Sequence, residues 1–395
     1  MKRIALLVAL VSLAAVPDST AATINVPVDQ PTIQAGINAA LKGDIVLVAP
    51  GTYVENINFL GKAITVKSSA GPATTIIDGN AAAPVAVFST NEGVRSVLSG
   101  FTLQNGVGSF MGGGVYISYS SPTITKNVIR SCNAGYGGGI GVYVGSPVLS
   151  YNTITGNSAS FGGGLSILGA SSGQVVHNTI SANTGGDGGG IALNGGGNAV
   201  LENNKIVNNN GGGEGGGLWI VNVSNEIIAQ NLIAKNVASS GSQVYSSIPA
   251  IPNGFELINN TIVSSPAGGA DAAVIADGYN TSEVIENNVI DAAGDHAALI
   301  CNPFYMVGPP IVRFNDAFNS AVAYGGSCTG FDGTNGNTSG NPTLVNITKN
   351  NYQLAAGSPA INAGTNSAPV VLKKDYAGHT RIVGGTIDIG AYEAQ

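Results

Sequence analysis

The chain has 395 residues, of which 44% are hydrophobic and only 9% are charged. This balance excludes a disordered chain and allows a long buried core. The net charge of -7 and the absence of any basic run argue against a nucleic-acid-binding protein, and they disfavour strongly anionic ligands.

The first residues have the pattern of an export signal. Lys2 and Arg3 precede an apolar run over residues 4–16, and small residues follow at 19–22. We predict a signal peptide at residues 1–22, and hence a secreted, periplasmic or cell-surface protein. No later stretch reaches the roughly 18 consecutive apolar residues of a membrane helix, so no membrane span is predicted.

One segment near the N-terminus has helical periodicity. Within residues 31–41, PTIQAGINAAL, the apolar residues Ile33, Ile37 and Leu41 are four apart. Pro31 suits a first helical position and Gly43 follows the end. We expect this helix to cover the open end of a repeat stack, as solenoids need such a cap, and we assign residues 23–95 to the cap and the first coils.

The middle of the chain is repetitive. Glycine triplets, each followed by a short apolar strand, return at intervals of 25, 25, 26 and 27 residues; they begin at Gly112, Gly137, Gly162, Gly188 and Gly215. A fixed period of this size indicates a repeat architecture. Three short strands per repeat fit the three sides of one coil of a parallel β-helix, and no segment here has helical periodicity.

Two asparagine series mark the corners of these coils. We expect each asparagine to adopt the left-handed conformation and to hydrogen-bond to the asparagine of the next coil. The first series is Asn127, Asn152, Asn178, Asn204, Asn231, Asn260 and Asn288, with a degenerate Asn315. The second is Asn133, Asn157, Asn183, Asn209 and Asn236.

Three parts of the sequence carry a family resemblance. The segment from Pro31 through AITVKSS resembles the N-terminal part of the pectin-lyase-like superfamily, and the glycine triplets and asparagine series are similar to those of its secreted β-helix repeat proteins. YQLAAGSPAINAG, followed by Asp375, Gly378, Arg381 and IDIGAYE, resembles the C-terminal segment of the choice-of-anchor Q proteins.

The resemblance implies an all-β fold, a right-handed parallel β-helix of roughly eleven coils with an N-terminal capping helix. We assign residues 96–340 to the repeats and residues 341–395 to a C-terminal cap, in which Asp375, Arg381, Asp388 and Glu393 form ion pairs. The superfamily scaffold hosts lyases, hydrolases, esterases and non-catalytic modules. Neither the paired catalytic aspartates of pectinesterases nor the Ca²⁺-binding aspartate clusters of pectate lyases are recognisable, so no catalytic role is transferred.

The three cysteines differ in their spacing. Cys301 and Cys328 are 27 residues apart, which is one coil, so the spacing allows a disulfide in an exported protein. Cys132 has no partner in phase and is expected to be buried as a small apolar residue.

Aromatic residues occupy outward positions of the strands that follow the triplets. Tyr116, Tyr143 and Trp219 lie on this nearly uncharged face, and aromatic rings suit stacking on the apolar faces of sugars. We therefore predict them as ligand-binding residues. The alternative is that they only shield the strand edges.

Two carboxylates precede successive triplets, Asp187 and Glu214. If they stack at about 5 Å, their repulsion needs a cation such as Ca²⁺, a raised pKa, or splaying into water. The extra residues in NNNGGGEGGG shift Glu214 out of register and favour splaying. These two are the only candidates for catalytic or metal-binding residues. No metal site or cofactor is predicted apart from this Ca²⁺ alternative. We expect His177 to be a solvated side chain. Asp295 and His296, in an irregular coil with Asp291, could bind a metal, but no third ligand occurs at a recognisable spacing.

Two functions from different classes remain open. The first is a monomeric exported or cell-surface β-helix that binds polysaccharide, a cell-surface glycan or a surface partner along its repeat face without catalysis. The alternative is a carbohydrate-active enzyme, a polysaccharide lyase or glycoside hydrolase, with Asp187 and Glu214 as its carboxylates. The scarcity of charged residues favours the first.

Overall fold

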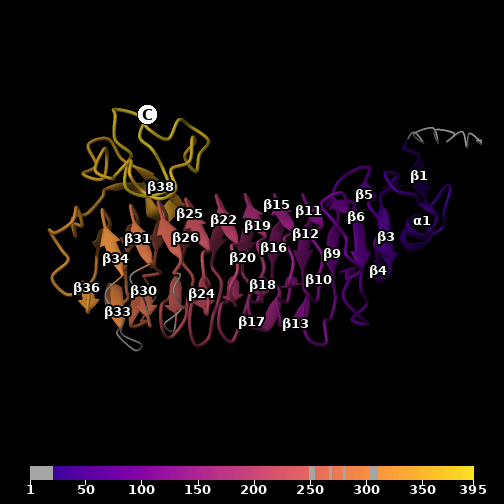
Figure 1. Cartoon of the computed structure of the whole chain (residues 1–395), viewed down its shortest axis with the longest axis horizontal. Coiled ribbons are helices and arrows are strands. Elements are labelled where there is room, and N and C mark those ends of the chain that lie inside the picture. Colours follow the sequence, from indigo (N-terminus) through magenta and orange to yellow (C-terminus); the bar gives the residue numbers. More distant parts are fainter. Residues whose placement is uncertain (1–20, 249–253, 267–268, 279–281, 303–309) are drawn as a thin grey trace, which may run out of the picture.

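The protein is a right-handed parallel β-helix. The computed structural model describes residues 21–248, 254–266, 269–278, 282–302 and 310–395. Three long parallel sheets wind around one axis as an elongated rod, shown in Figure 1. The predicted signal peptide lies, apart from Ala21 and Ala22, outside the described residues. None of the helices that the described ranges contain is long and apolar enough to cross a bilayer.

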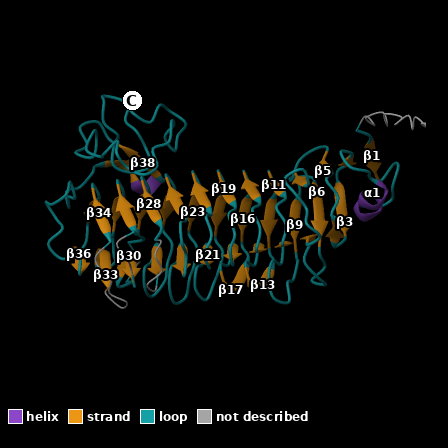
Figure 2. Cartoon of the chain, viewed as in Figure 1, coloured by secondary structure: helices purple, strands orange, loops and turns teal. Residues whose placement is uncertain are grey.

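Each sheet takes one short strand from nearly every coil, as Figure 2 shows in orange. Sheet A consists of β1 (Thr23–Val26), β2 (Ile45–Val48), β5 (Thr65–Ser68), β8 (Val97–Ser99), β11 (Thr123–Thr125), β15 (Val148–Ser150), β19 (Gln174–Val176), β22 (Val200–Glu202), β25 (Ile227–Ala229), β28 (Glu256–Ile258), β31 (Val284–Glu286) and β34 (Ile311–Arg313). Sheet B consists of β3 (Gly51–Val54), β6 (Thr75–Asp78), β9 (Thr102–Gln104), β12 (Val128–Arg130), β16 (Thr153–Thr155), β20 (Thr179–Ser181), β23 (Lys205–Val207), β26 (Leu232–Ala234), β29 (Thr261–Val263), β32 (Val289–Asp291) and β35 (Asp316–Phe318).

Sheet C holds the strands that follow the glycine triplets. Its members are β4 (Ile57–Asn58), β7 (Ala86–Phe88), β10 (Val115–Ser118), β14 (Ile140–Tyr143), β18 (Leu165–Leu168), β21 (Ile191–Asn194), β24 (Leu218–Val221), β27 (Val244–Ser247), β30 (Ala272–Asp277), β33 (Ala297–Asn302) and β36 (Val322–Gly326). A short fourth side pairs β13 (Asn133–Tyr136) with β17 (Ser158–Phe161). Sheet C therefore continues past Val221, where the triplets stop.

The core fills the inside of the coils. Successive side chains of a strand point to opposite faces, so one or two apolar side chains per strand point inward, and equivalent ones stack along the rod. Ile124, Leu149 and Val175 are aligned in neighbouring strands of sheet A and are fully buried. The repeat period thus places apolar residues of successive coils next to one another in one continuous core.

The α-helix α1 (Ile33–Ala39), the one that the described residues contain, covers the N-terminal end of this core. It is shorter than predicted. Thr32 is the N-cap, and its side chain accepts from the amide of Ala35. Ile33 and Ile37 are fully buried, whereas Leu41 is 69% exposed and lies beyond the helix.

Charged side chains hold both ends of α1. Glu55 accepts from the amides of Ile33 and Gln34, each at 2.9 Å. Lys62 Nζ donates to the carbonyls of Ile37, Asn38 and Ala40 at 2.7 to 2.9 Å. A negative group at the N-terminus and a positive one at the C-terminus both suit the helix dipole.

The first asparagine series forms a continuous buried ladder. In each step the side-chain oxygen of one asparagine accepts from the backbone and side-chain nitrogens of the asparagine before it, as Asn204 does from Asn178 at 2.9 and 3.1 Å. Asn315 is a full member, and Asn337, which the repeat pattern did not predict, continues the ladder. The expected hydrogen bonding between asparagines is confirmed.

The expected backbone conformation of these asparagines is wrong. The residue with positive φ is the one before each ladder position, such as Lys126, Tyr151 and His177. This arrangement leaves the asparagine amide free to turn inward along the axis.

The second series is also a ladder, but its first member is Cys132 and not Asn133. The amide of Cys132 donates to Asn157 Oδ1 at 3.0 Å, whereas Asn133 is exposed and pairs with Ser158. Cys132 is buried, as predicted, and burial raises the pKa of its thiol to about 11. At the other end, Gln243 Oε1 accepts from Asn236 in place of an asparagine.

We expect Cys132→Asn to stabilise the protein. The amide of Gly106 now donates only to the thiol sulfur, at 3.4 Å, and an asparagine oxygen would accept it better. The expected gain in the free energy of unfolding is about 1 kcal/mol, measured by chemical denaturation. An unchanged or lower stability would show that this position does not accept a ladder amide.

The first glycine of each triplet makes a corner that only glycine fits. Gly137 has φ +60°, and a Cβ there would lie 2.1 Å from the carbonyl oxygen of Ile140 in the same turn. The equivalent glycines of the other triplets also have positive φ. The triplet is therefore a turn that leads into sheet C.

The C-terminal segment packs against the outside of the last coils, as the yellow chain beside β38 in Figure 1 shows. It contains β37 (Leu344–Asn346), the 3₁₀ helix η1 (Ile347–Lys349) and β38 (Asn351–Leu354). Gln230, Asn259 and Asn287, in the row just before the first ladder, donate to its backbone carbonyls.

Four charged residues hold this segment together. Arg381 is fully buried, lies 3.7 Å from Glu393 Oε2 and donates to the carbonyls of Asp388 and Gly390. Burial lowers the pKa of Arg381 to about 10, although the neighbouring carboxylates oppose this shift. Asp375 and Asp388 accept mainly from backbone amides. One ion pair and a set of backbone hydrogen bonds therefore replace the expected ion-pair cluster.

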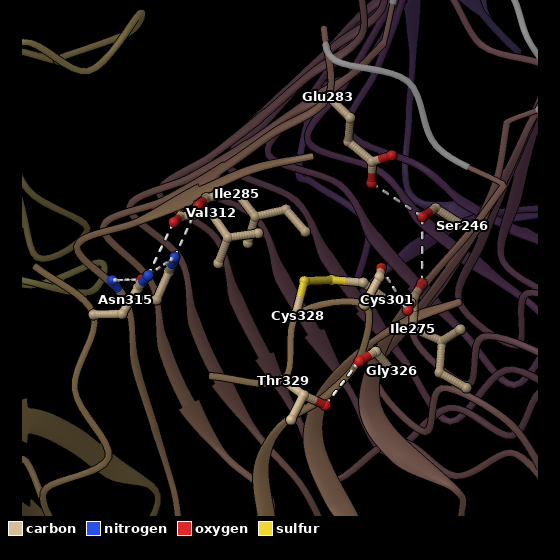
Figure 3. Close-up of a disulfide and its surroundings, with 12 residues drawn as sticks. Ser246, Ile275, Glu283, Ile285, Cys301, Val312, Asn315, Gly326, Cys328 and Thr329 are labelled. Carbon is tan, nitrogen blue, oxygen red and sulfur yellow. Dashed lines mark hydrogen bonds between the residues drawn. A yellow bond between two sulfur atoms is a disulfide. The ribbon is translucent and has the colours of Figure 1, made fainter. Parts of the chain in front are cut away.

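Cys301 and Cys328 form a disulfide at the C-terminal end of the rod, drawn in yellow in Figure 3. Their Cα atoms are 5.5 Å apart, and both side chains are buried in the core.

Candidate functional site

A long groove follows the edge between sheets B and C. Its floor is one column of residues, paired from coil to coil: Val107, Asn133, Ser158, Thr184, Asn210 and Val237. Three adjoining sections have volumes of about 440, 660 and 310 Å³. The column spans five coil steps, about 24 Å at the spacing of parallel strands. An extended chain of several sugar rings fits this length.

The groove is lined by small, neutral residues. Its central section contains only Gly, Ala, Ser, Thr, Asn and Val. Asp78 is the one charged residue in the three described sections, and it accepts from Gln104 and Asn105 at 2.8 Å. The lining therefore offers hydrogen-bonding groups and close access to the backbone, without a cation for an anionic ligand.

Aromatic residues stand next to groove residues in the chain, toward sheet C, although their side chains are not among those that line the three sections. Phe110, Tyr136 and Phe161 each follow a groove residue, Ser109, Gly135 or Ser160. The ring centroids of Phe110 and Tyr136 are 5.3 Å apart, and those of Tyr136 and Phe161 are 4.9 Å apart with an angle of 17° between planes. Trp219 continues the row at 5.3 Å from Phe161. We call Phe110, Tyr136, Phe161 and Trp219 the aromatic row.

Asp187 and Glu214 occupy the positions that follow Tyr136 and Phe161 in the next two coils. The amide of Gly188 donates to the carbonyl of Glu214, so the two carboxylates are in register and the expected displacement of Glu214 is wrong. Their side chains nevertheless bind different partners. Asp187 Oδ1 accepts from the amide of Glu214, and Glu214 Oε2 accepts from Trp219 Nε1, both at 2.9 Å.

One oxygen of each carboxylate therefore accepts a hydrogen bond from an uncharged N–H group. No group of three or more potential metal-ligating side chains occurs within the described ranges. Asp295, also considered from the sequence, accepts from Ser242 Oγ and from the amides of Gly269 and Ala270, so it holds a loop at the end of the groove.

The three aromatic residues predicted to bind ligand are not equivalent. Trp219 joins the aromatic row, and although its position is outward it is half-buried and packs against the cluster around Tyr245. Tyr116 lies in the same column of sheet C, but Ser166 and Ala192 between them are buried. Tyr143 is 37% exposed in the other outward column, where its ring meets Tyr119 edge to face at 5.6 Å.

The outward side of sheet C is therefore not the flat, open face that the sequence suggested. Residues before the triplets cover part of it, as Met111 does by packing over Gly141. Sequence reasoning missed Phe110, Tyr136 and Phe161. The recurrence of an aromatic residue just before two successive triplets was the available signal.

His177 is exposed on the opposite side, at the corner between sheets A and B, as expected for a solvated side chain. Its ring stacks on Tyr151 at 5.0 Å, away from the groove.

Comparison with known proteins supports this fold. A family model described as a right handed beta helix region matches residues 113–289. The crystal structure of a pectate lyase superposes with a TM-score of 0.61 at 16% sequence identity, covering 91% of this chain and 90% of that one. The chain is a right-handed parallel β-helix. At this identity the likeness concerns the fold alone.

Two further structures align less well. A PL6 family alginate lyase gives a TM-score of 0.40 at 12% identity, covering 90% of this chain and 60% of that one. A mannuronic acid specific polysaccharide family 6 lyase from human gut microbiota gives 0.40 at 14%, covering 78% and 77%. No curated protein matches the sequence.

Proposed function

We propose that the protein is exported or held at the cell surface and that it binds a neutral or weakly acidic polysaccharide in the groove between sheets B and C, without cleaving it. The aromatic row along this neutral groove is the observation that carries the proposal. Neighbouring rings repeat at nearly the coil spacing next to amide and hydroxyl groups of the groove. Sugar rings offer an apolar face to such rings and hydroxyl groups to such side chains.

The lining also bears on the class of polymer. Uronate polymers carry one negative charge per ring, and a site for them needs positive groups to offset the desolvated carboxylates. The described sections of the groove contain no Lys, Arg or His, while Asp187 and Glu214 follow the aromatic row. This distribution supports a neutral polymer over a highly charged one.

The alternative is a lyase or hydrolase that uses Asp187 and Glu214. Two observations favour it: Asp187 follows the groove residue Gly186 with Glu214 in register beside it, and the fold is similar to that of a pectate lyase. Against it, the two carboxylates are held by N–H donors, and Glu214 is turned toward Trp219.

Replacement of one ring in the row tests the proposal. We expect Tyr136→Ala to weaken binding to a neutral polysaccharide about tenfold, because loss of a well-packed aromatic contact costs roughly 1.4 kcal/mol or more. Affinity electrophoresis against xylan, mixed-linkage glucan, galactomannan, polygalacturonate and alginate gives the measurement. Tyr143→Ala is the matched control, since Tyr143 is an exposed aromatic residue in another column and should leave binding unchanged.

Two results would contradict this proposal. Equal loss in both variants would place the ligand on the wider face of sheet C, where the sequence first suggested it. Release of unsaturated or reducing ends from any of these polymers, abolished by Asp187→Asn or Glu214→Gln with the fold intact, would establish the enzyme instead.

A further inference from the structure

A separate cavity lies between the last strands of sheet B and the C-terminal segment. Asp291 and Phe318, paired across β32 and β35, form one wall, and Leu344 and Ile347 of β37 and η1 form another. Its volume is about 560 Å³. Small-molecule sites typically measure roughly 300–1,000 Å³. None of its lining residues belongs to the groove.

Asp291 has an incomplete set of hydrogen bonds. Its Oδ1 accepts from the amide of Ala293 at 3.0 Å and from Asn319 Nδ2 at 2.8 Å. Its Oδ2 is buried and has no hydrogen-bond partner within the described ranges, and the side chain as a whole is fully buried. A buried carboxylate oxygen without a donor is costly, so a donor on a ligand in the cavity would lower the free energy of the site.

The remaining lining is divided by polarity. Phe318, Leu344 and Ile347 supply apolar surface, whereas Asn319 and Ser339 supply exposed, neutral polar groups. No Lys, Arg or His lines the cavity, so an anionic ligand would lack a counter-charge. Burial raises the pKa of Asp291, although its hydrogen bonds from Asn319 and Ala293 oppose this shift. A neutral ligand with one apolar face and a hydroxylated edge matches this lining best.

We propose that this cavity is a second carbohydrate site, which takes a single neutral sugar unit with one hydroxyl group donating to Asp291 Oδ2. The ring lies against Phe318 and Leu344, and its remaining hydroxyl groups face Asn319 and Ser339. The site differs from the groove in size and position. It suits a chain end, a side branch or a free sugar, whereas the groove suits an extended chain.

The test uses the full-length mature protein and the methyl glycosides of glucose, galactose, mannose and N-acetylglucosamine. Glucuronic acid and glucosamine serve as charged counterparts. We expect at least one neutral glycoside to bind in calorimetric or ligand-observed NMR titrations. Asp291→Asn should weaken that binding at least tenfold, because Oδ1 keeps its two donors while the free acceptor becomes an N–H donor.

The control variant is Asp316→Asn. Asp316 is another buried aspartate of sheet B, both of its oxygens lack hydrogen-bond partners among the described residues, and it does not line the cavity. Removing its charge should leave glycoside binding unchanged. If Asp291→Asn fails to fold, Ser339→Leu at an exposed lining position fills the cavity and should abolish binding.

Several outcomes would overturn the proposal. These are no binding of any neutral glycoside, binding that survives both cavity variants, or binding restricted to glucosamine or glucuronic acid. Tyr136→Ala distinguishes the two sites, because it should weaken polysaccharide binding in the groove and leave monosaccharide binding in the cavity unchanged. Failure of the cavity proposal would in turn leave polysaccharide binding by the groove unaffected.

Discussion

Asn178→Val is expected to lower the free energy of unfolding by about 3–5 kcal/mol, which is large for one residue. Asn178 is buried in the middle of the first ladder. Its side-chain nitrogen donates to the carbonyl of Leu149 at 2.8 Å and to Asn204 Oδ1, and its own Oδ1 accepts from both nitrogens of Asn152. Valine would leave these buried groups in two neighbouring coils without a partner.

The matched control for this variant is Asn133→Val. The sequence pattern placed Asn133 in the second ladder, but the structure places it at the floor of the groove, where it is exposed and its side chain donates to the carbonyl and hydroxyl oxygens of Ser158. We expect its replacement to change stability by less than about 1 kcal/mol. Chemical denaturation of both variants gives the comparison. Similar losses at the two positions would contradict the ladder assignment.

The repeat period predicted the fold well, because a parallel β-helix puts residues of equal phase next to one another. Asn152, Asn178 and Asn204 recur at equal phase and therefore had to stack. The repeat pattern gave the wrong residue where either of two adjacent residues could occupy a ladder position. Cys132 and Asn133 are adjacent, and the residue type favoured Asn133. The ladder accepts Cys132 because its small, apolar side chain fills the buried position while its amide still binds Asn157.

The candidate site was predicted less well, for two physical reasons. In the aromatic row, Tyr136 and Phe161 occupy equivalent positions of successive repeats. Phe110 and Trp219 occupy other positions of the repeat, and the folded chain brings their rings into contact with the first two. The cavity at Asp291 joins strands of sheet B to a segment after residue 338, and contacts so distant in sequence leave no periodic signal. The sequence placed Asp187 and Glu214 before successive triplets, but it predicted the wrong register for Glu214 and did not reveal the indole and amide donors that hold the two carboxylates.

The chain shares its fold with a pectate lyase, and no Lys, Arg or His lines the described sections of its groove. Its few charges are used for structure. Glu55 and Lys62 bind the ends of α1, and Arg381 and Glu393 hold the C-terminal segment. The groove remains lined by small neutral residues with aromatic rings beside it. Asp78 is the one charged residue in the three described sections, and the absence of Lys, Arg and His from them is the physical basis for proposing a neutral polymer as the ligand.

Loss of the disulfide is expected to have the other large effect on stability. The bond closes a loop of 27 residues, which corresponds to about 3.5 kcal/mol in the chain-entropy model. Cys328 follows β36, and the turn after it leads to Asn337, the last residue of the first ladder. Because each coil contacts mainly its neighbours, the loss should be local to this end of the rod.

We therefore expect Cys301→Ala/Cys328→Ala to speed amide hydrogen exchange over residues 310–340 while exchange in the coils of β10 to β24 stays unchanged. Cys132→Ala controls for the loss of a buried sulfur in the middle of the rod, where no disulfide exists. Reduction of the unmodified protein should reproduce the local effect of the double variant. Uniform acceleration along the whole chain would show that the coils unfold as one cooperative unit, and no acceleration near Asn337 would show that the disulfide does not hold this end closed.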